Sequence, residues 1–210
     1  VENIPVRRFT FFDLINAAPG VSQSTQTSSR SQAFGSAANE NLYLLDGTDF
    51  TAPLSGAAWP WPNTDAIDEV QVLSLGANAE YGNVGGAVFN IVTRQGSNAF
   101  HGDSNFYYQN SGLTGRNTTD DQDAGQPYNR ARFRDSTTQL GGPIMKDKLW
   151  FFGSFQYQAD WESQPGTPKD FPAKSNAKRY FWKLNYSLNQ NHRFQVQTHD
   201  HFYEIPERAP

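Results

Sequence analysis

The second half of the chain contains several stretches in which apolar and polar side chains alternate with a period of two. The clearest is Arg179 to Leu188, where Tyr180, Trp182, Leu184, Tyr186 and Leu188 alternate with mostly polar residues. Because successive side chains of a β-strand point to opposite faces of a sheet, the pattern predicts a strand with one apolar and one polar face. The same pattern, less regular in places, predicts further strands over Phe100 to Gln109, Leu149 to Gln158 and Arg193 to Phe202, and a fifth strand is expected around Arg132 to Leu140 without an assigned face.

A tilted strand needs roughly 9 to 11 residues to cross a bilayer, and each of the predicted strands, about five in all, is close to this length. The connections between them alternate in length. Asn110 to Asn129 and Asp160 to Ala177 are long, whereas the turns near Met145 to Lys148 and at Asn189 to Asn191 are short. Long outer loops and short periplasmic turns are typical of outer-membrane barrels, and a β-sandwich has no reason to alternate in this way. We therefore expect residues 96–210 to be transmembrane β-barrel strands, with the long loops outside the cell.

Residues 1–95 follow a different pattern, which predicts a small α+β domain. Apolar residues at helical spacing from Phe11 to Ala18 predict a short helix that ends at Pro19-Gly20. Three brief apolar runs predict strands of one small sheet, at Leu42 to Leu45, Val70 to Leu75 and Val88 to Thr93.

Two long polar segments separate these elements, Val21 to Asn39 and Thr48 to Asp65. Loops of this length in a compact unit are usually functional or disordered. The second carries Trp59 and Trp61 beside Pro53, Pro60 and Pro62, a composition that argues against disorder and suits stacking on a ligand. The alternative, that both tryptophans cover the core of the domain itself, stays open.

Composition narrows the function classes. The net charge is −4, from 17 basic and 21 acidic residues, so the chain lacks the positive field of a nucleic-acid-binding protein. It has no cysteine and no apolar run of the length that marks a transmembrane helix. It begins without Met and stops soon after a predicted strand, so we expect a piece of a longer protein.

Several segments resemble the TonB-dependent outer-membrane receptors, most nearly their Oar-like branch. The resemblance includes the Leu44-Leu45-Asp46-Gly47 strand end and a turn motif, Gly141-Gly142-Pro143-Ile144 with Lys146-Asp147-Lys148. Further matching segments are Asn3-Ile4-Pro5, Leu14 to Val21, Asn39 to Tyr43, Ala66 to Leu73, Ala79 to Gly82 and Gly85 to Arg94.

This resemblance implies a plug domain, residues 1–95, in the lumen of a barrel of roughly 22 strands. The complete protein is then expected to bind and import a scarce ligand, with the plug gating the lumen. Its partners would be outer-membrane lipid and the inner-membrane TonB complex, which contacts a segment absent from this chain.

By position in the family pattern, the outward plug loops give the expected substrate-binding residues Trp59, Trp61, Phe34 and Asp49. The expected contacts between plug and barrel wall are Asp68, Glu80 and Arg94. One departure bears on these contacts, because Asp68-Glu69 and Gln71 stand where many members carry an acidic-basic pair and a second acid.

Other functions receive less support. No nucleophile elbow, phosphate loop or HExxH motif is present, and we expect neither an enzyme nor a cofactor. The acids Asp120, Asp121 and Asp123 lack the spacing of a calcium loop, and His199 with His201 do not complete a metal site, so no metal is expected. The alternatives are a β-rich carbohydrate-binding module, or an outer-membrane structural or export component on the same fold.

Overall fold

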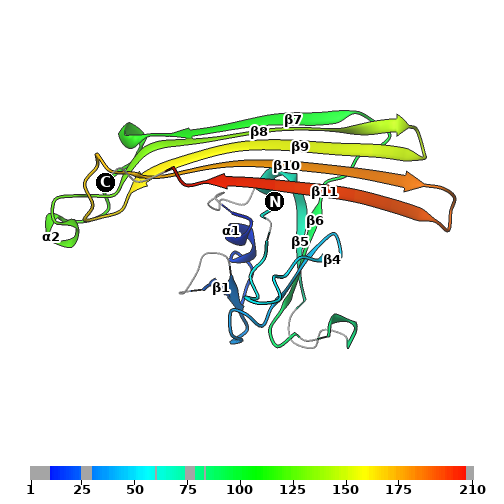
Figure 1. Cartoon of the computed structure of the whole chain (residues 1–210), viewed down its shortest axis with the longest axis horizontal. Helices are drawn as coiled ribbons and strands as arrows, with labels where there is room; N and C mark the ends of the chain where they lie inside the picture. Colours follow the sequence, from blue (N-terminus) through cyan, green and yellow to red (C-terminus); the bar gives the residue numbers. More distant parts are fainter. Residues whose placement is uncertain (1–9, 25–29, 60, 74–78, 83, 207–210) are drawn as a thin grey trace. The chain divides into compact units, whose positions relative to one another are not determined.

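The computed structural model describes residues 10–24, 30–59, 61–73, 79–82 and 84–206. The chain divides into two compact units, Val1–Gln95 and Gly96–Pro210 (Figure 1). The predicted opening segment Asn3-Ile4-Pro5 lies outside the described residues. Within the described ranges, no helix is both long and apolar enough to span a membrane.

The first unit is a four-stranded mixed sheet with a short helix and a two-stranded hairpin. The sheet has the order β4-β3-β6-β5, in which β3 and β6 run parallel and the other neighbours antiparallel. The three predicted strands are therefore confirmed as members of one sheet, although β5 begins three residues earlier than expected and positions 74–75 lie outside the described residues. The elements are α1 (Phe12–Ile15), β1 (Val21–Gln23), β2 (Ser31–Ala33), β3 (Leu42–Leu45), β4 (Thr48–Asp49), η1 (Thr64–Ala66), β5 (Ile67–Leu73), η2 (Ala79–Tyr81) and β6 (Val88–Thr93).

The core of this unit forms where α1 packs on the sheet. Phe11, Leu14 and Ile15 are buried, as the helical spacing predicted, in a cluster that includes Tyr43 and Phe89. The helix itself is only one turn long. After it the backbone continues in tighter i to i+3 hydrogen bonds, from the Ala17 and Ala18 amides to the Leu14 and Ile15 carbonyls. The spacing thus gave the buried face correctly and the helix length incorrectly.

The segment expected to be a loop, Val21 to Asn39, contains the antiparallel hairpin β1–β2. Strand β2 of this hairpin is partly buried although it is polar, because side chains from elsewhere in the unit form hydrogen bonds with its backbone. The Ser31 amide donates to the Tyr43 hydroxyl at 3.1 Å, and the Asn41 amide group donates to the Ser31 carbonyl at 2.6 Å. Burial raises the pKa of Tyr43, so this hydroxyl keeps its proton. No apolar alternation marks such a strand in the sequence.

The Asp46-Gly47 pair does more than turn the chain after β3. Asp46 adopts a positive φ of 49°, and its two carboxylate oxygens accept hydrogen bonds from the amide and the hydroxyl of Thr93 at 2.9 and 2.6 Å. The Gly47 amide donates to the Asn90 side chain at 3.0 Å. The Asp46-Gly47 motif therefore joins the end of β3 to β6, the last strand of the unit, through side-chain hydrogen bonds.

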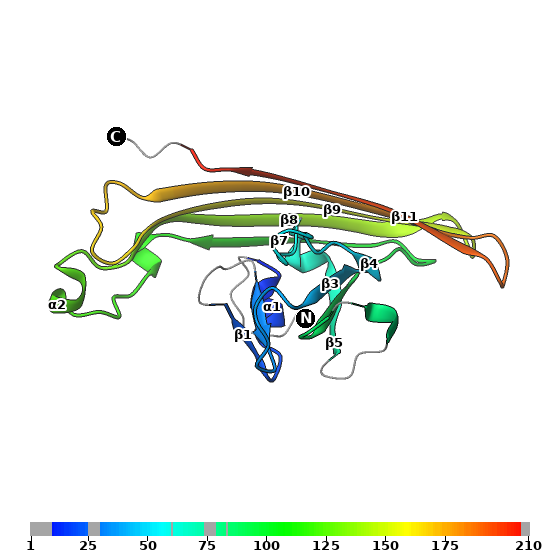
Figure 2. The ribbon, with the colours of Figure 1, turned by 60° about the horizontal axis from the view of Figure 1, so that its bottom comes forward.

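The second unit is one five-stranded antiparallel sheet in the order β11-β10-β9-β8-β7, so every strand pairs with its neighbour in sequence (Figures 1 and 2). All five predicted strands are present. The predicted alternation of long and short connections holds, and the first long loop contains η3 (Ser111–Leu113) and α2 (Asp120–Asp123). The strands are β7 (His101–Gln109), β8 (Asn129–Met145), β9 (Leu149–Ser163), β10 (Ala173–Ser187) and β11 (Arg193–Glu204).

The sheet has one apolar and one polar face. On β10 the exposed Trp182 and Leu184 alternate with the buried Phe181 and Lys183. Gly153 of β9 makes room for the Trp182 ring, since a Cβ there would lie 2.5 Å from it. The exposed apolar face includes Phe106, Leu140, Phe155, Tyr157, Trp182, Leu184, Tyr186, Phe194, Val196 and Phe202.

We predict that Leu184→Arg destabilises the intact, membrane-inserted protein by roughly 2 to 4 kcal/mol, because the charge would enter the hydrocarbon layer near its midplane. Asn185→Arg, on the opposite face, is expected to cost far less. The free energy of unfolding from lipid vesicles in a urea titration measures both. A large loss for Asn185→Arg and none for Leu184→Arg would show that the register is inverted by one residue.

Candidate functional site

The two tryptophans of the plug loop are placed very differently by the structure. A bridge between Thr51 and Ala58 closes the loop after β4. Trp61 is only 8% exposed, belongs to the core cluster and donates its indole N–H to the Ala58 carbonyl at 3.2 Å. Trp59 is 52% exposed. The two rings stack with centroids 5.3 Å apart, so Trp61 is the buried support of an exposed Trp59. Trp61 therefore fits the core alternative, and only Trp59 offers a free ring.

The other two expected substrate residues are exposed but serve local geometry as well. Phe34 has a φ of 52°, and its ring lies so close to Gly20 that a Cβ there would approach it to 2.5 Å. Asp49 accepts a hydrogen bond from the Thr51 amide at 2.8 Å. Among the contacts described, Trp59 and Trp61 are the only expected substrate residues that touch each other.

The expected wall contacts all lie on the sheet or beside it. Asp68 is exposed at a bulge of β5, where the register shifts between Ile67 and Glu69. Glu80 is exposed in η2. Arg94 is half-buried, and its amide donates to the Ala66 carbonyl at 2.8 Å. Their role as contacts between plug and barrel stays a prediction.

The polar face of the sheet carries a hydrogen-bonded network that spans three strands. Asp135 of β8 accepts from the Gln156 amide at 2.9 and 3.0 Å, and Gln156 accepts from the Arg179 guanidinium at 2.8 Å. Arg179 also donates to Gln158 at 3.4 Å. All four side chains are buried, so the network holds an arginine and a carboxylate away from bulk water. Alternation in the sequence predicted a polar face, but not which polar groups would pair.

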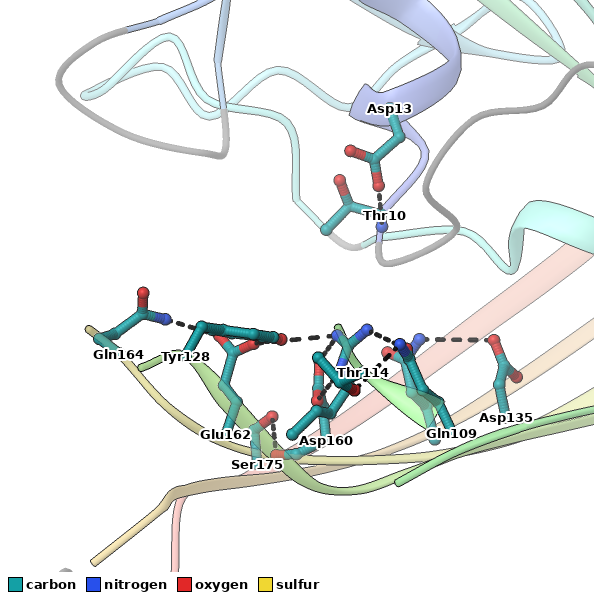
Figure 3. Close-up of polar contacts among 12 residues, drawn as sticks. Thr10, Asp13, Gln109, Thr114, Tyr128, Asp135, Asp160, Glu162, Gln164 and Ser175 are labelled. Atoms are coloured by element: carbon teal, nitrogen blue, oxygen red, sulfur yellow. Dashed lines mark hydrogen bonds and ion pairs between the residues drawn. The ribbon is translucent and has the colours of Figure 1, made fainter. Parts of the chain in front are cut away.

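A second polar cluster lies near the ends of β8 and β9 beside the long loops (Figure 3). Two nitrogens of the Arg130 guanidinium donate hydrogen bonds to the Asp160 carboxylate, at 3.0 and 2.6 Å, and a third donates to the Gln109 side chain at 2.9 Å. Tyr128 donates to Glu162 at 2.6 Å. Burial, followed by this hydrogen bond to a carboxylate, raises the pKa of Tyr128 to about 12, so the phenol remains a donor.

A β-bulge fixes which arginines join this cluster. Arg130 pairs with Glu162 and Arg132 with Trp161, which leaves Ala131 as an extra residue on β8. The extra residue turns Arg130 toward the polar face and Arg132 toward the apolar face. Arg132 places its guanidinium 4.3 Å from the centre of the Trp161 ring, a cation–π contact.

Two acids of the first long loop form ion pairs with an arginine. Arg116 contacts both Asp120 and Asp123. A hydrogen bond from Thr118, with further help from Arg116, lowers the pKa of Asp123. Within the described residues, no group of three or more metal-binding side chains is found.

Comparison with known proteins identifies the second unit. Residues 92–200 match the family model described as an outer membrane beta barrel domain. The chain belongs to this family. An outer-membrane β-barrel exposes its apolar face to lipid and its polar face to the lumen, which accounts for the two faces of the sheet and places the protein in the bacterial outer membrane.

Relatives extend the likeness over both units of this outer-membrane barrel protein. The TonB-dependent transporter Oar of Myxococcus xanthus is 29% identical over 87% of the chain, which spans 20% of that protein. The siderophore receptor PirA of Acinetobacter baumannii shares the fold with a TM-score of 0.73 at 18% identity, over 95% of this chain and 30% of PirA. The ferric enterobactin receptor PfeA of Pseudomonas aeruginosa shares the fold with a TM-score of 0.68 at 17% identity, over 95% of this chain and 32% of PfeA. The chain thus shares the fold of a plug followed by barrel strands that these receptors have.

We predict that Arg130→Met destabilises the intact barrel by about 3 kcal/mol. The Asp160 side chain is only 3% exposed and would lose the guanidinium that forms two hydrogen bonds with its carboxylate. Arg132→Met, two residues away on the other face, is the matched control and is expected to cost about 0.5 to 1 kcal/mol through the loss of its contact with Trp161. Urea unfolding from vesicles measures both changes. Equal losses would show that the buried pair contributes nothing specific to stability.

Proposed function

We propose that the complete protein is a TonB-dependent transporter that binds a ligand at its plug and moves it through the barrel lumen. The observation that carries this proposal is the alignment with the transporter Oar across both units of the chain, rather than across the barrel strands alone. A plug is needed only in a barrel wide enough to leak, and its removal from the lumen requires energy from outside the outer membrane. The TonB complex is the proposed source of that energy.

The proposal sets the direction of the strands. The long loops after β7 and β9 face the outside of the cell, and the tight turns after β8 and β10 face the periplasm, as in other outer-membrane barrels. The turn after β8 is closed by a hydrogen bond from the Lys148 amide to the Met145 carbonyl at 3.2 Å. The lumen side of the sheet then carries the Asp135–Gln156–Arg179 network.

Cysteines introduced at Asp121 and at Gln190 test this orientation. A membrane-impermeant thiol reagent applied to intact cells is expected to label the Asp121→Cys protein, and to label Gln190→Cys only after the outer membrane is opened. Wild type has no cysteine, so it provides a blank background. Labelling of both positions from the same side would contradict the topology.

The exposed ring of Trp59 is the proposed contact with the transported ligand. An indole that is held from below by a buried partner has little conformational freedom to lose when it stacks on a planar or ring-shaped group. Phe34 and Asp49, on separate exposed turns, are proposed to add contacts. PirA is named as a siderophore receptor and PfeA as a ferric enterobactin receptor, so a ligand of the siderophore class is the first to test.

Trp59→Ala in the complete protein is expected to weaken ligand binding and uptake by tenfold or more while barrel assembly, followed by heat-modifiable gel migration, stays normal. Trp61→Ala is expected to destabilise the plug as well, by about 3 kcal/mol or more, since a buried ring is lost from the core. Isothermal titration with candidate ligands and uptake in cells measure the effects. Unchanged uptake in Trp59→Ala would remove this residue from the ligand surface.

A further inference from the structure

The tight turn between β8 and β9 holds the segment that leads into β7. This turn carries the sequence motif Gly141-Gly142-Pro143-Ile144 with Lys146-Asp147-Lys148, for which no function has yet emerged. Residues 96–100, which connect the first unit to β7, contact the motif at several points. We call residues 96–100 the joint, and keep the name turn motif for the residues that receive it.

The Asn98 side chain ties the joint to the turn motif with three hydrogen bonds. Its amide group donates to the Asp147 carboxylate at 2.6 Å. Its carbonyl oxygen accepts from the Asp147 backbone amide at 2.9 Å and from the Trp150 indole N–H at 2.7 Å. Both ends of one side-chain amide are therefore used, and they bind the side chain and the backbone of the same turn residue. Asn98 is thereby fixed in both position and orientation.

The backbone at Asp147 shows that the aspartate side chain serves the joint. Asp147 has a φ of 63°, in the left-handed region that glycine adopts without steric cost. Glycine would therefore satisfy the turn alone. The carboxylate adds the acceptor for the Asn98 amide group, which glycine could not supply.

Glycines allow the joint and the turn motif to approach each other closely. A Cβ on Gly142 would collide with the ring of Phe100, the last residue of the joint. A Cβ on Gly96, the first residue of the joint, would collide with the Phe151 carbonyl oxygen and lie 3.0 Å from that of Gly142. Both ends of the joint are therefore seated against β8 and β9.

Very little chain separates this seat from the last anchor of the first unit. The Arg94 amide donates to the Ala66 carbonyl at 2.8 Å, within the first unit. Gln95 is the single residue between Arg94 and Gly96. Two steps along the backbone reach at most about 7 Å. While both anchors hold, the end of β6 therefore has almost no freedom to move away from Gly96.

The two anchors differ in their exposure to water. In the first unit, Thr93 is 3% exposed and donates from its amide and its hydroxyl to the two carboxylate oxygens of Asp46. In the second unit, Asn98 and Asp147 are both exposed. Water competes for the hydrogen bonds of exposed groups and lowers their net contribution. The contact between Asn98 and the turn motif is therefore the anchor that releases more readily.

We propose that Asn98 and the turn motif form a reversible latch on the C-terminal end of the plug. Strand β6 pairs with both β3 and β5, so the latch holds the plug sheet through β6. Opening it lengthens the free connection from one residue to six, Gln95 to Phe100, and extends its reach from about 7 to about 24 Å. A closed latch keeps the plug in place and the pore shut, a role that rests on the proposed gating function.

An exchange of donor and acceptor tests the latch in the complete protein. Asn98→Asp keeps an oxygen for the Asp147 amide and the Trp150 indole, but sets a second carboxylate against that of Asp147. Adding Asp147→Asn restores the hydrogen bond with donor and acceptor exchanged. The matched control is Asn189→Asp in the other short turn, where the Asn189 side chain accepts from two backbone amides at 2.9 Å.

Two measurements separate the contact from its role. The protein is labelled with [15N]tryptophan in lipid nanodiscs, and the Trp150 indole N–H signal, assigned by its loss in Trp150→Phe, reports the bond to Asn98. Conductance across a planar lipid bilayer reports open pores, and heat-modifiable migration reports assembly. None of these needs a ligand or the TonB complex. Absence of ligand uptake by the wild type would therefore count against the proposed function and not against the latch.

Asn98→Asp is expected to shift the Trp150 signal and to raise the frequency of open pores about tenfold, while wild type, control and double variant stay closed. An unshifted signal, or a double variant that does not recover, would overturn the latch. Equally frequent opening in the control, or closed pores despite a shifted signal, would overturn its role in holding the plug. If Asn98→Asp does not assemble, Trp150→Phe decides, because it removes one of the three hydrogen bonds and keeps a ring; about threefold more opening is expected, and no increase would overturn the proposal.

Discussion

The unbroken hydrogen-bonded ladder from β7 to β11 is the constraint on which the rest of the second unit depends. A strand in lipid must satisfy its backbone through its neighbours, because no water is present to do so. Once the ladder is fixed, each side chain is committed to lipid or lumen by its parity in the strand. The exposed apolar face, the Asp135–Gln156–Arg179 network and the placement of Arg132 beside Trp161 are all consequences of the same register.

Within this frame, charge is handled differently on the two faces. On the lumen side, Arg179 is buried and Arg130 partly buried among amides and carboxylates that limit the cost of removing them from water. On the lipid side, Arg132 and Lys174 lie near the strand ends and pack against the Trp161 ring. Arginine thus ties neighbouring strands together on the lumen side and packs on an aromatic ring on the lipid side.

Sequence alone predicted most of what depends on periodicity. Alternation predicted the strands and the faces of all but β8, and helical spacing predicted the buried side of α1, because both follow from backbone geometry. Elements held by side-chain hydrogen bonds were missed. Strand β2 is one, since Ser31 is buried against Tyr43 and Asn41 without an apolar pattern.

The candidate site was predicted less completely for the same reason. Trp59 and Trp61 share a loop and a residue type, and only the tertiary fold decides that one ring is buried and the other exposed. The pairing of Arg130 with Asp160 depends on a bulge that no local pattern announces. Resemblance to a family supplied the identity of the domain, whereas the roles of these individual side chains depend on the tertiary fold.

The bulge at Ala131 also bears on how this sequence can change over evolutionary time. A single insertion or deletion within a regular strand exchanges lipid-facing and lumen-facing side chains on one side of the change, so such events are confined to loops. At Ala131 the strand already carries one residue more than its partner. A lineage that deletes this alanine would make Arg130 and Arg132 consecutive residues of a regular strand, which point to opposite faces as they do now, so the tie to Asp160 and the contact with Trp161 would both be kept. The position is therefore one at which a barrel strand can change its length without exchanging its two faces.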